Sequence, residues 1–255
     1  MSNPTLPAEL LDHITDHLDT RRALGDCCLV SKLWIPRTRK HLFASIEFRT
    51  AVDLESWKKK FPDPSTSPAC YTKALTIGCP EEVTVADAEV GGWIRGFSHI
   101  VHLELKGYLA DNLTPLFHGF SPTIKSLDVN VTMLSPSHIF NLILSFPLLE
   151  DLRVTGWEVR GGGSPDGLPT VIQPSNPPIF TGSLELSMPR MEPIIHRLLS
   201  LPSGIQFRSL TLNWTRDEDG LLTTALVEKC SHTLESLSLA CGPSGTLIRR
   251  LRPYR

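Results

Sequence analysis

Beyond residue 43 the apolar positions of the chain recur at a regular spacing. Eight six-residue units follow the pattern apolar-x-x-apolar-x-apolar, with Thr at the first position in two of them. Within each unit the last two apolar residues alternate with an intervening residue, which predicts a strand with one buried face. Successive unit centres are 29, 28, 24, 25, 32, 26 and 27 residues apart, and they fall at Ile46, Leu75, Leu103, Leu127, Leu152, Leu184, Leu210 and Leu237.

Apolar segments of helical length lie between several of these predicted strands. The clearest are residues 135–146, 189–201 and 217–234. Ser135-Pro136 is typical of a helix start, with a capping hydroxyl before a first-turn proline. Pro147 and Pro202 follow two of the segments and predict that the helices end there.

Alternating strands and helices predict an α/β fold with a parallel sheet. The period of 24 to 32 residues is close to that of leucine-rich repeats, in which stacking neighbours bury a continuous core. The Asn or Cys that such repeats carry after the strand is absent, so we expect an irregular solenoid over residues 44–255. A doubly wound sheet is the alternative, although no phosphate-binding turn follows the first strand. The residues that stand at the position of the Asn or Cys are Tyr108, Thr132, Trp157, Pro189, Thr215 and Gly242.

The first 43 residues have a different pattern. Leu10, Leu11, Ile14 and Leu18 fall at helical spacing and form one apolar face. Pro7 suits the start of that helix, and two further short helices are expected up to Phe43. Three short helices bury little surface by themselves, so we expect another molecule or domain to cover their apolar faces.

Three segments of this region carry a family resemblance. They are Leu-Pro-x-Glu-Leu-Leu-x-x-Ile at 6–14, Cys-Leu-Val-Ser-Lys-Leu-Trp at 28–34 and Arg-x-x-x-His-Leu-Phe at 37–43. Together they resemble the F-box, in the form abundant in mushroom-forming fungi. The resemblance implies a three-helix F-box over residues 1–43 that binds the Skp adaptor of an SCF-type cullin-RING ubiquitin ligase. It also implies that the repeats hold a protein substrate. The implied adaptor-binding residues are Leu6, Pro7, Leu10, Ile14, Leu29, Val30 and Trp34.

Two alternatives to this interpretation stay open. The seven residues could be the ordinary core of a helical module, or the F-box could serve a scaffold assembly unrelated to ubiquitin. On the repeats, we expect substrate to contact residues that alternate outward on the strands. These are His102, Glu104, Lys125, Asp128, Asp151, Arg153, Glu185 and Arg208, with Thr211, Glu235 and Ser238 as further members.

Composition excludes several classes of function. The 255 residues carry 25 basic and 27 acidic side chains, so no overall field favours nucleic acid or an acidic membrane. The N-terminus lacks a secretory signal, and no apolar run reaches the length of a membrane helix. We therefore expect a cytoplasmic or nuclear protein. Its six cysteines lack Cys-x-x-Cys pairs, so we expect no metal site and free thiols that are mostly buried.

No motif for catalysis or cofactor binding emerges. The nine histidines are scattered, and Gly-x-Ser-x-Gly is absent. We expect no enzyme activity, no cofactor and no metal. The Gly- and Pro-rich residues 160–178 are expected to form a surface loop rather than a phosphate cradle. Because the chain ends soon after a predicted strand, without a polar capping repeat, we also expect residues to be missing at the C-terminus.

Overall fold

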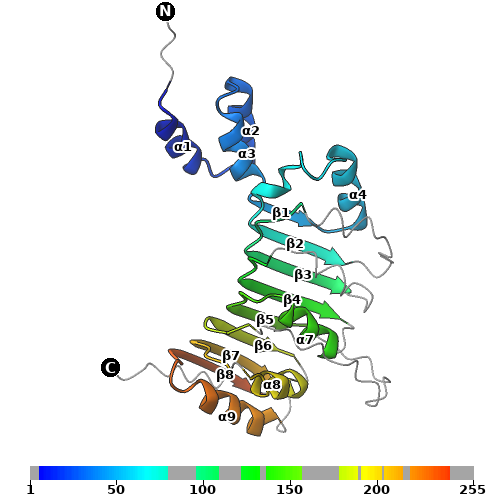
Figure 1. The fold of residues 1–255 in the computed structure, drawn as a ribbon, viewed down its shortest axis with the longest axis vertical. Coiled ribbons are helices and arrows are strands. Elements are labelled where there is room, and N and C mark those ends of the chain that lie inside the picture. Colours follow the sequence, from blue (N-terminus) through cyan, green and yellow to red (C-terminus); the bar gives the residue numbers. More distant parts are fainter. Residues whose placement is uncertain are drawn as a thin grey trace, which may run out of the picture.

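The computed structural model has an α/β fold with an eight-stranded, all-parallel sheet (Figure 1). It describes residues 6–79, 96–108, 122–132, 136–156, 178–188, 191–202, 204–214 and 219–241. The strands lie one below another along the long axis of the molecule, and β1 is the strand nearest to the three N-terminal helices. The expected α/β class with a parallel sheet is confirmed. The Gly- and Pro-rich stretch and the C-terminal residues lie almost entirely outside the described residues.

Three short helices precede the sheet. They are α1 (Ala8–Asp16), α2 (Arg21–Val30) and α3 (Ile35–Leu42). Pro7 stands directly before α1, and the Thr20 hydroxyl caps α2 by accepting a hydrogen bond from the Ala23 amide at 3.2 Å. Both α1 and α2 pack against α3. The three helices therefore form one small unit, which we call the helical unit.

All eight predicted strands form, and each pairs with the next one along the chain. A doubly wound sheet would reverse its strand order at a switch point. This order has no reversal, so the doubly wound alternative is wrong. The strands are β1 (Ser45–Phe48), β2 (Ala74–Cys79), β3 (His102–Tyr108), β4 (Ser126–Thr132), β5 (Asp151–Thr155), β6 (Ser183–Ser187), β7 (Ser209–Trp214) and β8 (Ser236–Cys241).

The register of the sheet follows the sequence repeat. The eight central apolar residues, from Ile46 on β1 to Leu237 on β8, are cross-strand partners in one unbroken row. Even the 32-residue gap between Leu152 and Leu184 leaves that row intact. A shift of one residue would turn each apolar side chain to the opposite face, so burial of this row fixes the register.

Helices cover one face of the sheet. Buried residues of α7 (Pro136–Leu144), α8 (Glu192–Leu199) and α9 (Asp219–Cys230) belong to the same apolar core as the inward-facing strand residues. Helix α4 (Ala51–Lys60) packs beside β1, and the short 3-10 helix η1 (Pro68–Tyr71) contacts α3. Alternate strand positions on the other face remain exposed or half-buried. We call this second surface the open face.

A ladder of backbone carbonyls joins neighbouring repeats where the strands begin. Just before most strands, one carbonyl accepts two consecutive amides of the next repeat. The Lys73 carbonyl, for example, accepts from Val101 at 2.8 Å and from His102 at 2.9 Å. Before β6, the Asp151 carboxylate instead accepts from the Ser183 amide at 2.7 Å. Backbone atoms thus satisfy most of the amides at the strand starts, with no recurring side chain. The carbonyls that accept two such amides belong to Ala44, Lys73, Val101, Lys125, Gly182 and Arg208.

The four cysteine side chains that the structure describes are free thiols. Only Cys230 is buried, and burial raises the pKa of its thiol, which keeps it protonated and unreactive. Cys27 and Cys28 are half-buried and Cys70 is exposed. The expectation that the cysteines are mostly buried is therefore wrong for the described ones. Their places in the short helical unit and in η1 offer too little core to bury a thiol.

None of the helices in the described ranges is long and apolar enough to cross a membrane.

Candidate functional site

The helical unit exposes most of its large apolar side chains. Of the eleven exposed large apolar residues in the described part of the chain, six lie between residues 6 and 33. Exposed apolar side chains are ordinary when scattered, but a concentration of them marks an interaction surface. We call these six residues the apolar helix surface. They are Leu6 (52% exposed), Leu10 (48%), Ile14 (39%), Leu29 (85%), Val30 (73%) and Leu33 (51%).

Helical geometry accounts for the exposure on α1. Leu10 and Ile14 are four residues apart and therefore share a face. The adjacent face carries Leu11 and Thr15, which are buried against the rest of the unit. Leu29 and Val30 form the last two residues of α2, where the chain turns toward α3 and offers no neighbour to cover them. The apolar helix surface thus comes from both α1 and the end of α2.

The interior of the helical unit is small. Its fully buried side chains are Leu11, Thr15, Leu24 and Thr38, and none of these belongs to the core of the sheet. The Thr38 hydroxyl lies 2.7 Å from the Cys28 sulfur and donates to the Trp34 carbonyl at 2.9 Å. The unit therefore keeps its own core, and the apolar helix surface is not part of that core.

Two exposed polar contacts join α1 to α3. The Arg37 guanidinium lies 2.6 Å from the Asp12 carboxylate, and His41 lies 3.1 Å from Asp16. Both carboxylates are about 60% exposed, so water screens these pairs and each contributes little, roughly 0–1 kcal/mol. Helix α1 is thus held mainly by its buried Leu11 and Thr15.

The structure places the seven sequence-predicted adaptor residues as follows. Leu6, Pro7, Leu10, Ile14, Leu29 and Val30 are exposed, whereas Trp34 is half-buried where it precedes α3. Six of the seven are therefore accessible to another molecule. The alternative in which all seven form the core of the helical unit is wrong for these six. Leu33 is equally exposed, and it lies in the same 28–34 segment, but it was not among the seven residues that the resemblance implied.

The open face of the sheet carries a row of charged side chains. Strand register aligns Glu104 on β3 with Asp128, Arg153 and Glu185 on the next three strands. His102 and Asp151 belong to the neighbouring row, and His102 Nδ1 lies 2.9 Å from the Ser126 hydroxyl. Lys125 and Arg208 come directly before β4 and β7, so their expected place on the strands is wrong. The period-2 alternation does not extend to residues that precede a strand.

Arg153 links two carboxylates of this row. Its guanidinium lies 3.5 Å from Asp128 and 3.2 Å from Glu185. Partial burial raises the pKa of Asp128, with Arg153 opposing this effect and the Glu104 and Glu185 charges adding to it. An incoming cation would therefore compete with Arg153 for Asp128, at the longer of the two contacts. The row offers carboxylates and one shared guanidinium to a polar partner.

The Glu104 carboxylate has closer partners than the Asp128 carboxylate. It accepts a hydrogen bond from the Thr76 hydroxyl at 2.8 Å and lies 2.9 Å from the Lys106 ammonium. Partial burial raises the pKa of Glu104, but the hydrogen bonds from Lys106 and Thr76 together with the Lys106 charge outweigh it. The pKa therefore lies below its ordinary value. Glu104 tethers β2 to β3 on the open face.

This shift predicts a pH-dependent contribution to stability. Because the pKa is lower in the folded than in the unfolded chain, the carboxylate stabilises the fold above its ordinary pKa. That stability is lost as the pH falls through the folded-state pKa. We expect Glu104→Gln to lower the free energy of unfolding at neutral pH by about 0.5–1 kcal/mol. The difference should shrink below about pH 4, when both states protonate. Urea titrations across this range measure it.

Glu150→Gln is the matched control for that experiment. Glu150 also pairs with a lysine, at 2.8 Å, although this one (Lys125) lies in the preceding repeat; Glu150 is 42% exposed and has no hydrogen bond from a threonine hydroxyl among the described contacts. We expect a smaller loss from this variant. An effect of Glu104→Gln that stayed constant from neutral to acid pH would contradict the assignment.

Among the described residues, no three His, Cys, Asp or Glu side chains are grouped so that they could hold a metal ion. Comparisons with known proteins add no relative: no family model matches the sequence, and no curated protein matches it. Two surfaces of the described chain therefore stand out as candidates for function. One is the apolar helix surface, and the other is the charged open face.

Proposed function

We propose that the chain is the substrate-recognition subunit of an SCF-type cullin-RING ubiquitin ligase. In this proposal the helical unit is a three-helix F-box that binds a Skp-type adaptor. The sheet and its helices are an irregular solenoid of leucine-rich-like repeats that holds a protein substrate. The observation that carries the proposal is the exposure of the apolar residues matching the F-box pattern. They are on the surface although the unit has a core of its own.

The repeat architecture supports the second half of the proposal. Parallel strands in sequential order carry the described helices α7, α8 and α9 on one face, and none of these covers the other face. Neighbouring repeats bury each other's apolar surfaces, so the stability of the stack comes mainly from that core and not from the open face. Its charged row is then available to a substrate. We assign substrate contacts to His102, Glu104, Asp128, Asp151, Arg153 and Glu185, with Lys125 and Arg208 at the edge where the strands begin.

Such a protein would perform no chemistry itself. It would hold the substrate near a ubiquitin-charged enzyme, and this proximity would make ubiquitin transfer effectively intramolecular. The connection between the helical unit and β1 matters here, because it sets the position of the substrate. One contact in that connection is the hydrogen bond from the Arg21 guanidinium to the Ser45 carbonyl, 3.0 Å long.

Reconstitution of the ligase tests the proposal. The 255-residue chain is co-expressed with a Skp-type adaptor and examined by size-exclusion chromatography with light scattering. We expect a one-to-one complex, which the combined change Leu6→Ala/Pro7→Ala/Trp34→Ala should abolish. Addition of the cullin-RING subunits, a ubiquitin-conjugating enzyme and ubiquitin should then modify lysines of the chain itself.

The results of this experiment distinguish a ubiquitin-ligase subunit from a scaffold unrelated to ubiquitin. A folded chain that does not bind the adaptor would refute the ubiquitin-ligase assignment. An adaptor complex that assembles with the cullin but never supports ubiquitin transfer would favour the scaffold alternative instead.

A further inference from the structure

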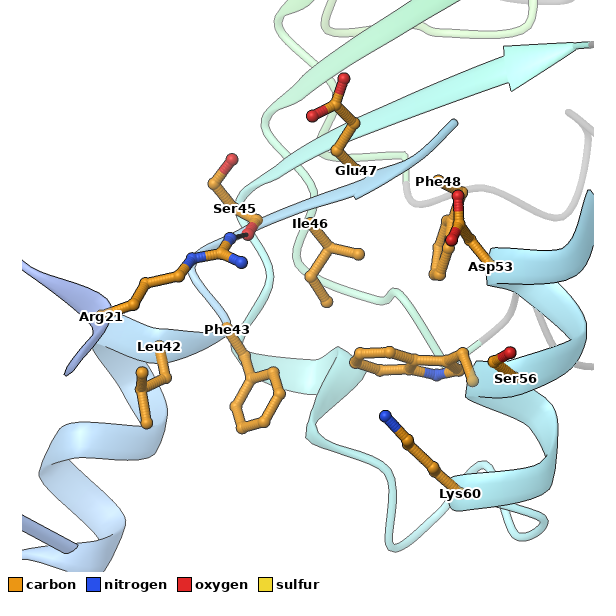
Figure 2. A pocket seen from close by; sticks show the side chains of 11 residues that line it. Arg21, Leu42, Phe43, Ser45, Ile46, Glu47, Phe48, Asp53, Ser56 and Lys60 are labelled. Carbon is orange, nitrogen blue, oxygen red and sulfur yellow. Dashed lines mark hydrogen bonds between the residues drawn. The ribbon is translucent and has the colours of Figure 1, made fainter. Parts of the chain in front are cut away.

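A cavity of about 260 Å³ opens where the helical unit meets the first repeat (Figure 2). It belongs neither to the apolar helix surface nor to the charged row of the open face. Its walls come from the start of α2, the end of α3, β1 and α4. Because its volume is just below that of typical small-molecule sites, it can hold one side chain or a ligand of that size.

Aromatic and aliphatic side chains form the apolar part of the cavity. Phe43, Phe48 and Trp57 line it, and the Trp57 ring lies edge-on to both phenylalanines, with centroid distances of 5.9 and 5.7 Å. These rings pack further against Phe61 and Phe97, so their positions are fixed. Leu42 and Ile46 complete the apolar lining. A flat or branched apolar group would be desolvated here.

The two acidic residues that line the cavity, Asp53 and Glu47, already have hydrogen-bond partners. The Asp53 carboxylate completes a capping box, in which it accepts from the amides of Arg49 and Thr50 at 3.0 Å each. The Glu47 carboxylate lies 2.9 Å from the Arg49 guanidinium. The hydrogen bonds lower the pKa of both groups, so both are ionised and engaged at neutral pH. Arg49 neutralises the charge of Glu47, whereas Asp53 keeps its negative charge in the first turn of α4, at the other end of that helix from Lys60.

The basic residues of the cavity keep donors to spare. Arg21 donates one guanidinium N–H to the Ser45 carbonyl, and its other donors have no partner among the described residues. Lys60 has no ion pair or hydrogen bond within the described part of the chain. Figure 2 shows that Lys60 extends from α4 toward the space in front of Phe43, while Arg21 reaches in from α2. Two cations with free donors thus flank an aromatic pocket.

We infer that this cavity is a binding site for an apolar group that carries a carboxylate. The aromatic walls take the apolar group, and the positive charges of Arg21 and Lys60 in the cavity walls attract the carboxylate, which accepts a charge-assisted hydrogen bond from whichever of the two it reaches. The C-terminal residue of a peptide and a small organic acid share this chemistry. Occupation would bridge α2 and α4, so a ligand here would also stiffen the connection between the helical unit and the sheet.

Nuclear magnetic resonance of the full chain tests the site with 4-phenylbutanoate as the probe. The indole N–H signal of Trp57, assigned with Trp57→Phe, should shift on titration, whereas that of Trp34 should stay in place. For a ligand this small we expect a dissociation constant on the order of 1 mM. The neutral analogue 4-phenylbutanamide has the same shape, and we expect it to bind at least about fivefold more weakly.

Variants that remove the charge of Arg21 or Lys60 show whether these two cations bind the carboxylate of the probe. Arg21→Gln and Lys60→Gln should each weaken binding of the acid by about two- to fivefold, because both groups are partly screened by water. Arg22→Gln and Lys59→Gln are the matched controls, since they remove neighbouring charges that do not line the cavity. Both controls should bind the acid as the original chain does.

A second titration distinguishes the two sources of the carboxylate. The probe is a tripeptide ending in phenylalanine, compared with its C-terminal amide. If the peptide acid binds more tightly than 4-phenylbutanoate, the natural ligand is a chain end; if it binds more weakly, the ligand is a free acid. Equal binding of acid and amide by the original chain, or unchanged binding by both Arg21→Gln and Lys60→Gln, would overturn the proposal. So would an unmoved Trp57 signal at millimolar probe.

Discussion

Replacing Leu29 and Val30 together by lysine is expected to abolish adaptor binding while leaving the fold intact. At 85% and 73% exposure, neither side chain contributes appreciably to the core. Lysines in the last turn of α2 also suit the negative end of the helix dipole. In a complex, however, each apolar side chain would be replaced by a buried cation without a partner. We expect affinity for a Skp-type adaptor to fall by more than about 100-fold.

The chain offers closely matched controls for this result. Leu221 is also 85% exposed, and Val52 is 71% exposed, but they lie on α9 and α4, away from the helical unit. Leu221→Lys/Val52→Lys makes the same chemical change at the same exposure and should bind the adaptor normally. Calorimetric titration of both double variants, with thermal melts to check folding, measures the difference. Equal loss of binding in the two variants would contradict an adaptor surface on α1 and α2.

The repeat was predictable from sequence because it depends on one regular signal. The buried row from Ile46 to Leu237 has the period of the strands, and burial of that row sets both pairing and register. The exposed helix residues were also accessible to sequence reasoning. Three helices as short as these contain more apolar positions than their own interior can bury, so Leu10 and Leu29 had to face outward or meet a partner.

Other features carry no such signal. The carbonyl ladder at the start of the strands is made by backbone atoms, so no residue type reveals it. Lys125 and Arg208 were misplaced because strand boundaries depend on that ladder rather than on alternation. The cavity unites Arg21 and Lys60, which are distant in sequence and belong to elements with different periodicities. That both line one cavity follows from how the helical unit sits on β1, which only the folded chain determines.

Leu127→Ala is expected to have the largest effect on stability. Leu127 is 1% exposed in the middle of β4, between Leu103 and Leu152 in the central apolar row. Truncation leaves a cavity that the rigid neighbouring strands cannot collapse to fill, so we expect the free energy of unfolding to fall by about 2–5 kcal/mol. Leu148→Ala removes the same atoms from a residue that is 52% exposed, and it should cost less than about 1 kcal/mol. Urea denaturation of the two variants compares them directly.

Leu127→Ala also tests whether adaptor binding by the helical unit depends on the stability of the repeats. Repeats contact mainly their neighbours, so a defect at β4 weakens both halves of the stack and should also reduce the cooperativity of unfolding. The helical unit has its own core of Leu11 and Leu24, which lies apart from that of the sheet. Leu127→Ala should therefore retain adaptor binding under native conditions, with an unchanged dissociation constant. A parallel loss of stability and adaptor affinity would mean that the helical unit depends on the intact sheet to hold its apolar surface in place.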